Sequence, residues 1–360
     1  MKNRVIRCLM ALALGVAAAS PAMAAPEYIL SLNLSIAPIH NRWNKALKPW
    51  ADEIEKRSGG RVVIEPYFAQ AISPQAEVVE SVRSGLADIG EATFTVGGLG
   101  RYPFHEQLLN LVKPSNCTVD PVTLVSGLHK AFPEQAAADT KGTRLLFLEG
   151  HSVGMLIGTR DKPITKLEDL KGMKIGVGGG GIRVERMKKL GATVVGVTIS
   201  DMYMSLEKGV IDGAVVDGDV LISRKIGDII KHMTLVNMGG SVFYCVMNPQ
   251  SYENLPPDLR QVIDEVSAEY APQVMKEFWD TMQYASLEKW MKEQGGKVYM
   301  LSAEDYAKAD ELVEPTYAEW VEFSKSKGLP AEDILAKFRE LEADCMKPWA
   351  DSPAAALVSR

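Results

Sequence analysis

The residues best suited to bind a charged group are four consecutive glycines, Gly178 to Gly181. They follow an apolar stretch that predicts a strand and precede a stretch that predicts a helix. Backbone N–H groups in such a loop can bind an anion, such as a carboxylate or a sulfonate, at the start of the helix. Gly178, Gly179 and Gly180 are therefore candidate ligand contacts. The alternative is a flexible turn that only leaves room for a bulkier ligand.

The same loop also matches the dinucleotide-binding pattern G-x-G-x-x-G, which here begins at Gly176. Asp201 follows near the place where an acidic residue would bind a ribose. An exported or mis-targeted dinucleotide-binding enzyme is therefore one alternative. The histidines and cysteines of the sequence lack the spacing of metal ligands. We expect no catalytic residues, no metal and no cofactor, and we predict that the chain is not an enzyme.

Candidate ligand groups also lie near the ends of several predicted strands. Arg183, in the first turn after the glycines, and Arg160 are the candidate cations, and for Arg183 the alternative is a solvent-exposed helix arginine. Glu91 and Thr93 follow a predicted strand at 87–90, where α/β sheets place their ligand loops. The other candidates lie in the first strand-to-helix connection and after two later strands: Asn33, Ser35, His40, Asp217 and Phe243.

Alternating strands and helices must position these groups. Strands are predicted at 28–33 and 61–67, with a helix at 40–57 between them, and this alternation is typical of α/β sheets. A second such region follows, and 257–346 is largely helical, with a break at Pro272. The fold class is thus α/β: a two-lobed periplasmic binding protein fold, each lobe a mixed β-sheet flanked by helices, with a ligand cleft at the hinge and a helical C-terminus.

The predicted domain boundaries divide the chain into a leader and two lobes. Residues 25–150 and 237–360 form lobe I with the C-terminal helices, and residues 151–236 form the inserted lobe II. Residues 1–24 have a basic start, an apolar stretch and an A-x-A site, which predict a cleavable signal peptide and a periplasmic location. The formal net charge of -6 argues against nucleic acid as a partner, because nucleic acid calls for a basic surface.

Three cysteines follow the predicted signal peptide. In an oxidising compartment one pair can form a disulfide, and we favour Cys117 with Cys345. Cys245 lies in an apolar run that predicts a buried strand. The alternative is three unpaired thiols.

Six segments together resemble one family of receptors. In order and spacing they are similar to the DctP-type receptors of tripartite ATP-independent periplasmic (TRAP) transporters. The segments are 54–62, 79–89 (VESVRSGLADI), 162–177 (KPITKLEDLKGMKIGV), 190–192, 203–213 (YMSLEKGVIDG) and 248–259 (NPQSYENLPPDL).

The resemblance implies a periplasmic receptor that performs no chemistry. Such a receptor captures a small organic solute, usually an organic acid, by lobe closure and delivers it to the permease subunits of a TRAP transporter. We expect a monomer. The alternative within this class is a receptor that senses a ligand for a signalling partner.

The sequence departs from the family at one position that concerns the ligand. Relatives typically read K-I-R-V at 174–177, and that arginine clamps a ligand carboxylate. Here the position is Gly176, and the stretch 214–216 is apolar where many relatives are polar. This chain therefore lacks the arginine with which the family clamps a carboxylate. We expect the solute to be either a carboxylate or a sulfonate.

Overall fold

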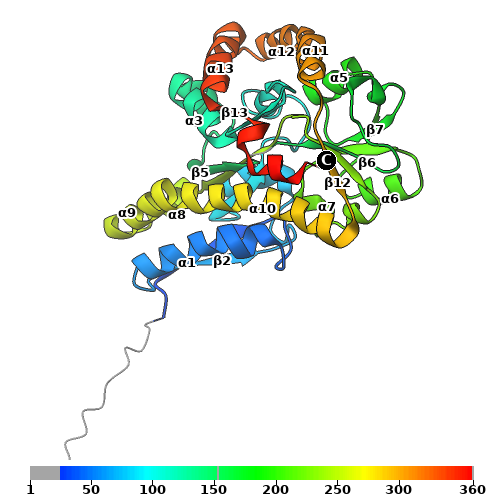
Figure 1. The fold of residues 1–360 in the computed structure, drawn as a ribbon. Helices are drawn as coiled ribbons and strands as arrows, with labels where there is room; N and C mark the ends of the chain where they lie inside the picture. The colour runs from blue at the N-terminus through cyan, green and yellow to red at the C-terminus, as the bar shows by residue number, and fades with distance from the viewer. Residues whose placement is uncertain (1–24, 152–153, 359–360) are drawn as a thin grey trace, which may run out of the picture.

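Two mixed β-sheets form the centres of two lobes (Figure 1). The computed structural model describes residues 25–151 and 154–358, so the predicted signal peptide at 1–24 lies outside the described residues. A two-stranded sheet of β4 (Cys117–Val119) and β13 (Met346–Pro348) joins two distant parts of the chain. The predicted class, two α/β lobes with mixed sheets and a helical C-terminus, is confirmed.

The first sheet has the strand order β2-β1-β3-β11-β5. Its strands are β1 (Tyr28–Asn33), β2 (Val62–Tyr67), β3 (Ile89–Thr93), β5 (Arg144–Gly150) and β11 (Val242–Met247). Strand β1 is parallel to β2 and β3, and β11 is antiparallel to β3 and β5. The carboxyl ends of β1, β3 and β5 therefore share one edge of the sheet with the amino end of β11.

The second sheet has the order β12-β10-β6-β9-β7-β8. Its strands are β6 (Leu156–Thr159), β7 (Lys174–Val177), β8 (Thr193–Gly196), β9 (Gly213–Val216), β10 (His232–Thr234) and β12 (Lys297–Tyr299). Strand β12 comes from outside the range 151–236 that we assigned to lobe II. The loops after β7 and β9 lie at the same edge as the start of β6, because β6 pairs antiparallel with β9 and β7 pairs parallel with β9.

These two edges face each other. The chain leaves the first sheet at the carboxyl end of β5 and enters the second at β6. His151, directly after β5, lies 3.6 Å from the carboxylate of Asp217, directly after β9. The loops that the sequence indicated as ligand-binding therefore meet where the lobes meet.

Helices cover both sheets (Figure 1). The helix predicted at 40–57 consists of a π-helical turn, Trp43–Leu47, followed by α1 (Lys48–Arg57). The other helices of the first two-thirds of the chain are α2 (Val78–Arg83), α3 (Pro121–Ala131), α4 (Pro133–Ala138), α5 (Ile182–Lys189), α6 (Met202–Glu207) and α7 (Asp219–Ser223). The later helices are α8 (Pro249–Glu253), α9 (Pro257–Glu265), α10 (Ala271–Gln294), α11 (Ala303–Val313), α12 (Pro315–Ser326) and α13 (Ala331–Cys345).

Helix α10 belongs to both lobes. A π-helical turn, Val266–Tyr270, precedes it, and Pro272 lies in its first turn, where the missing N–H breaks no helical hydrogen bond. Its Trp279 packs in the apolar core beneath the first sheet, and its Trp290 packs in the core of the second lobe. The break that the sequence predicted at Pro272 is thus a π-helical turn at a helix boundary.

The favoured disulfide between Cys117 and Cys345 is wrong. Cys117, Cys245 and Cys345 are all free thiols. Strand β13 pairs Met346 with Val119, and the antiparallel register then places Cys345 beyond the end of β4, about three residues from Cys117. Three residues along a strand span roughly 10 Å, and a disulfide needs Cα atoms within about 7 Å.

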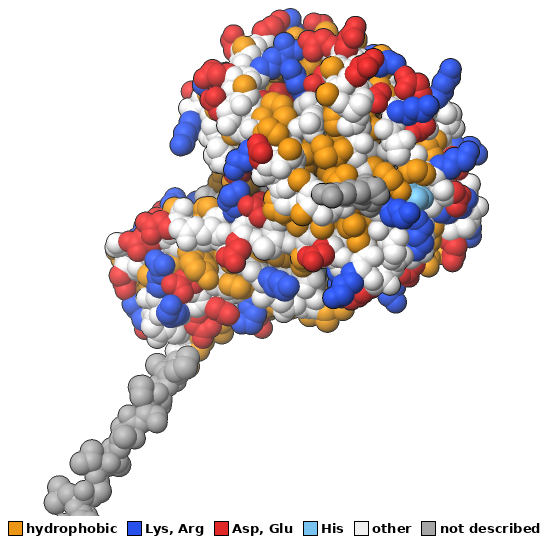
Figure 2. All heavy atoms as spheres, in the orientation of Figure 1, with side chains coloured by type: hydrophobic (Ala, Val, Ile, Leu, Met, Phe, Trp, Pro, Cys, Tyr) orange, Lys and Arg blue, Asp and Glu red, His pale blue; other side chains and the backbone are white. Residues whose placement is uncertain are grey.

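The face of the molecule in Figure 2 shows no separation of charge. On the face in Figure 2, basic and acidic side chains are interspersed, so no basic patch is present there. Within the part of the chain that the structure describes, no helix is both long and apolar enough to cross a bilayer.

Candidate functional site

Three buried charged side chains meet at the edge of the first lobe. Arg42 Nη2 donates to Glu91 Oε2 at 2.7 Å, and Arg42 Nε lies 4.0 Å from Glu149 Oε1. The side chains of both glutamates are fully buried, and that of Arg42 is 4% exposed. Burying charges is costly, and one cation between two carboxylates offsets part of that cost.

The strand register explains why these groups meet. Glu91 lies in β3 and Glu149 in β5, with β11 between the two strands. Phe243 of β11 is paired with Glu149, and paired residues share one face of the sheet. The Arg42 side chain reaches this face from the start of the first helix, with its guanidinium carbon 4.3 Å from the centre of the Phe243 ring.

An aromatic wall adjoins the charges. Phe243 and Trp279 are stacked, with ring centres 5.6 Å apart, and the His151 ring stands edge-on, 4.3 Å from Trp279. The indole N–H of Trp279 donates to Glu149 Oε2 at 3.1 Å. The wall therefore fixes the orientation of the Glu149 carboxyl as well as covering it.

The second lobe and α10 complete the site. Asp217 approaches His151, and the backbone N–H of Gly218 donates to Gln283 Oε1 of α10 at 2.5 Å. We call the whole group the interlobe cluster. Its members are Arg42, Glu91, Glu149, His151, Asp217, Phe243, Trp279 and Gln283.

Several polar atoms of the interlobe cluster have no hydrogen-bond partner among the described residues. These buried atoms are Arg42 Nε, Glu91 Oε1, Glu149 Oε1 and Gln283 Nε2. Buried polar atoms are nearly always hydrogen-bonded in folded proteins, to protein or to water. Two donors, on Arg42 and Gln283, and two carboxyl oxygens of the cluster are therefore left without a hydrogen bond among the described residues.

Burial sets the protonation of the cluster. It raises the pKa of Glu91 to about 8, against the opposing charge of Arg42 and with the help of Glu149. It also raises the pKa of Glu149 and of Asp217. Burial, then Arg42 and Arg183, lower the pKa of His151 to about 3, so its ring is neutral near pH 7. The cluster can thus hold protons on its carboxyl groups.

The glycine loop is partly occupied by the protein itself. The N–H of Ile182, the first residue of α5, donates to Gln107 Oε1 of the first lobe at 3.1 Å. A Cβ on Gly181 would lie 2.5 Å from the same oxygen, whereas a Cβ on Gly179 would meet nothing. The loop faces the first lobe as predicted, but its helix start is already capped.

The surroundings of Gly176 explain why this chain has no arginine at that position. A Cβ at this position would lie 2.6 Å from Ile211 Cδ1 and 3.0 Å from Met202 Sδ. The position therefore points into the apolar interior of the second lobe. A larger side chain does not fit there unless its neighbours shift.

Arg183 is a structural link between the lobes. Its guanidinium donates to Asn110 Oδ1 at 2.7 Å and to the backbone oxygens of Met238 and Gly240 at 3.0 and 3.2 Å. Burial lowers its pKa to about 10. The expected alternative, a solvent-exposed arginine, is wrong, because the side chain is buried against the first lobe.

Some of the other predicted residues lie in or near the interlobe cluster, and others do not. It brings Glu91, Asp217 and Phe243 into the interlobe cluster. The half-buried His40 lies next to the cluster, since its Nδ1 accepts from the backbone N–H of Arg42 at 3.1 Å. Burial and then the charge of Arg42 lower the pKa of His40, and Asp219 opposes them. The half-buried Ser35 follows β1 on the chain segment that leads to His40.

Three predicted residues lie elsewhere or are engaged with their own lobe. Asn33 donates to Ser73, and the hydroxyl of Thr93 donates to the backbone of Val242. Arg160 follows the far end of β6 and binds Asp161 and the backbone of Leu206. Because β6 runs away from the first lobe, the structure does not bring Arg160 to the cluster.

Sequence reasoning missed five members of the cluster: Arg42, Glu149, His151, Trp279 and Gln283. The available signal was Glu149 followed by His151, two polar residues at the end of an apolar strand. Arg42 and Trp279 carried no such signal, because each lies on an ordinary amphipathic helix.

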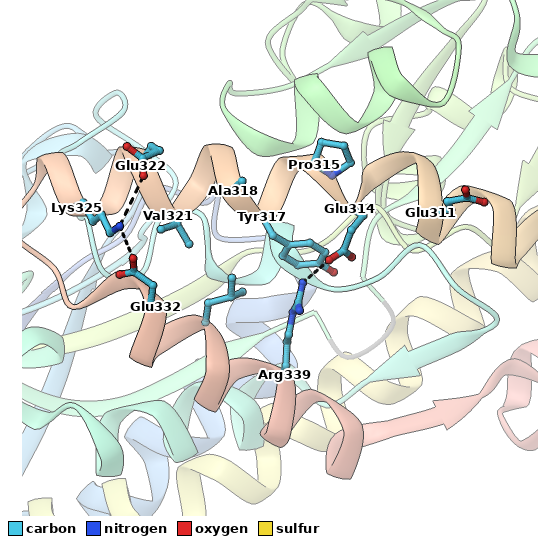
Figure 3. A pocket seen from close by; sticks show the side chains of 11 residues that line it. Glu311, Glu314, Pro315, Tyr317, Ala318, Val321, Glu322, Lys325, Glu332 and Arg339 are labelled. Atoms are coloured by element: carbon cyan, nitrogen blue, oxygen red, sulfur yellow. Dashed lines mark hydrogen bonds and ion pairs between the residues drawn. The ribbon is translucent and has the colours of Figure 1, made fainter.

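A groove of about 730 Å³ lies elsewhere on the surface, between α12 and α13 (Figure 3). Its charges pair with one another: Arg339 binds Glu314 at 2.7 Å, and Lys325 binds Glu332. This groove therefore offers a solute few uncommitted polar groups. In residues 25–151 and 154–358, no group of three or more metal-ligating side chains could hold a metal ion.

Two α/β lobes with a buried polar cluster between them define the class of two-lobed solute-binding proteins. The chain belongs to the bacterial extracellular solute-binding proteins of family 7, the DctP family, whose model matches residues 35–323. This family consists of periplasmic solute receptors that work with the permeases of TRAP transporters.

Relatives and solved structures agree with this membership. The C4-dicarboxylate-binding periplasmic protein DctP of Rhodobacter capsulatus is 25% identical over 335 residues, which cover 89% of this chain and 95% of the relative. A TRAP solute-binding protein from Rhodoferax ferrireducens, solved with copurified benzoate, is 24% identical with a TM-score of 0.75, covering 88% of this chain and 98% of that one. A TRAP solute-binding protein from Bordetella bronchiseptica, solved with (R)- and (S)-mandelate, is also 24% identical, with a TM-score of 0.72 and coverage of 88% and 99%.

Proposed function

We propose that this chain is an extracytoplasmic receptor that captures a small organic acid between its lobes and delivers it to a TRAP permease. The observation that carries the proposal is the interlobe cluster, in which buried polar atoms of the first lobe and of α10 lack hydrogen-bond partners among the described residues. Similar folds have been solved with benzoate, mandelate and glucuronate, all organic acids. The proposed location is the periplasm, to which the predicted signal peptide would direct the chain.

The cluster and the glycine loop have separate proposed roles. Arg42 of the cluster and the N–H groups of Gly178 to Gly180 in the loop are the proposed contacts for polar and anionic groups of the solute. Phe243 and Trp279 provide an apolar wall for its carbon skeleton. A solute that touches both lobes binds the closed form better than the open form, and this difference in affinity drives closure.

A thermal-shift screen tests the proposal. The protein is unfolded, stripped of bound solutes, refolded and mixed with carboxylates, sulfonates, amino acids, polyols and nucleotides. An organic acid that binds the native state should raise the melting temperature by mass action. Small-angle scattering should then show a smaller radius of gyration with that acid than without it.

Other outcomes would support the alternatives. Stabilisation by a dinucleotide alone would contradict the receptor proposal and support the dinucleotide-binding enzyme. Stabilisation by an acid without uptake, when the chain is reconstituted with its permease in vesicles, would support the sensing receptor instead.

A further inference from the structure

The spacing of two unpaired atoms indicates what the solute carries. Arg42 Nε and Glu149 Oε1 lie 4.0 Å apart, and each is buried without a hydrogen-bond partner among the described residues. This distance is too long for a direct hydrogen bond. It fits one oxygen atom placed between them, at roughly 2.8 Å from each, a normal hydrogen-bond length.

The chemistry of the two atoms limits the bridging group. Arg42 Nε–H is a donor and needs an acceptor, whereas an ionised Glu149 needs a donor. A hydroxyl group supplies both at one atom, and it can also accept from a protonated Glu149. An ammonium group cannot accept from Arg42, and an ionised carboxylate, which has no proton to donate, can bridge the two only when Glu149 is protonated.

The protein holds both partners of this bridge in place. Trp279 occupies the other oxygen of Glu149, which leaves Oε1 as the free acceptor. Glu91 binds one terminal nitrogen of Arg42, and Phe243 lies against the guanidinium. The two atoms therefore form a pre-oriented donor–acceptor pair.

We propose that the solute is a hydroxylated organic acid whose hydroxyl group bridges Arg42 and Glu149. This inference rests on the proposed function and narrows its solute class. Glu91 Oε1, the second unpaired carboxyl oxygen beside Arg42, can bind a further hydroxyl group, as a donor while Glu91 is protonated and as an acceptor once it is ionised. A solute with neighbouring hydroxyls fits the cluster as well as one with a single hydroxyl.

Matched acids test this inference directly on the unmodified protein. Each set shares a carbon skeleton and differs in one substituent: propionate, lactate and alanine; phenylacetate, mandelate and phenylglycine; succinate, malate and aspartate. Affinities come from calorimetry on the stripped protein. In the set whose skeleton fits, the hydroxy acid should bind at least about tenfold tighter than the unsubstituted acid, as expected for a hydrogen bond to charged groups.

A pair of isosteric variants tests the residue assignment. Glu149→Gln removes the charge of the proposed acceptor and should reduce the preference for the hydroxy acid several-fold. The matched control is Glu342→Gln, since Glu342 is also buried but accepts from the backbone N–H of Lys113, outside the cluster. The control should retain the full preference.

The failures of the two proposals can be told apart. If acids bind without regard to the hydroxyl, as they would if water fills the bridge, this inference is wrong and the receptor proposal stands. If the amino member binds tightest, the hydroxyl bridge is also wrong. If no organic acid in the screen or the matched sets binds, both proposals are wrong. The matched acids need no variant, so misfolding of Glu149→Gln would leave the test intact.

Discussion

The facing edges of the two lobes differ in how far the protein satisfies its own polar groups. On the first lobe, Arg42, Glu91 and Glu149 are buried together and keep three atoms without a hydrogen-bond partner in the part of the chain that the structure describes. On the second lobe, the start of α5 is capped by Gln107, and Arg183 has three protein acceptors. The start of α5 and Arg183 look available in the sequence, yet both bind protein groups, whereas the first lobe keeps unpaired side-chain atoms.

This comparison shows that a charged residue near a cleft can either bind other protein groups and stabilise the fold or keep atoms free to bind a solute. The hydrogen bonds of Arg183 hold α5 against the first lobe, so this guanidinium positions one lobe relative to the other. Arg42 is held by only one close ion pair and keeps its Nε unused. Substitutions at the two arginines should therefore have different consequences.

The largest expected effect comes from Arg42→Met. Removing the cation leaves two buried carboxylates without their partner, which should lower the free energy of unfolding by about 3–5 kcal/mol and abolish acid binding. Urea denaturation and calorimetry measure the two effects. Arg83→Met, at an exposed arginine, is the control. A loss of stability no greater than that of the control would contradict the role of Arg42.

Arg183→Met should cost less stability and act differently on binding. It removes the donor to three buried acceptors, for an expected loss of about 2–3 kcal/mol. Because Arg183 has its own protein partners, the affinity for the acid should fall much less than with Arg42→Met. A variant with intact stability and lost affinity would instead place Arg183 in the solute site.

The third effect is a pH dependence. The pKa of Glu91 is raised from 4.5 to about 8, so the folded state holds this proton more tightly than the unfolded state. The resulting stability is complete below pH 4.5 and is lost as the pH rises towards 8, at up to about 1.4 kcal/mol per pH unit. Urea midpoints at pH 5 to 8 should fall more steeply for the unmodified protein than for Glu91→Gln. Parallel slopes would show that Glu91 is ionised throughout.

The smallest effects concern the glycine loop. Gly181 has a φ of 71° and faces Gln107, so Gly181→Ala should cost about 1–2 kcal/mol. Gly180→Ala is the control, because its Cβ would only make an ordinary contact, 3.7 Å from Leu99, and it should cost less than about 0.5 kcal/mol. Equal melting temperatures for the two variants would mean that Gln107 does not cap α5 in solution.

Much of the fold could be predicted because its signals are local. Strand β1 has the predicted bounds, and the helical C-terminus follows the predicted stretch closely. Helix α3 was missed although its signals were present: Asp120 caps it and Pro121 begins it. Three-residue strands such as β4, β12 and β13 carry no such signal, because only their partners make them strands.

The site was harder to predict, because its contacts are distant in the sequence. Arg42 and Glu91 are 49 residues apart, and nothing near either residue indicates the other. The alignment of Gly176 with a ligand-binding arginine identified a position but not the direction of its side chain. That direction depends on Ile211 and Met202, which only the folded lobe brings near.

Helix α10 has a mechanical consequence for solute capture. It spans roughly 36 Å, at about 1.5 Å per residue, and is anchored at two points. Trp279 is bonded to Glu149 of the first lobe, and Trp290 donates to the backbone of Gly227 and Ile230 in the second. Any movement of the lobes towards each other must bend α10 between Trp279 and Trp290 or rotate the lobes about the axis of α10. The stiffness of α10 between Trp279 and Trp290 would therefore limit how far the angle between the lobes can change.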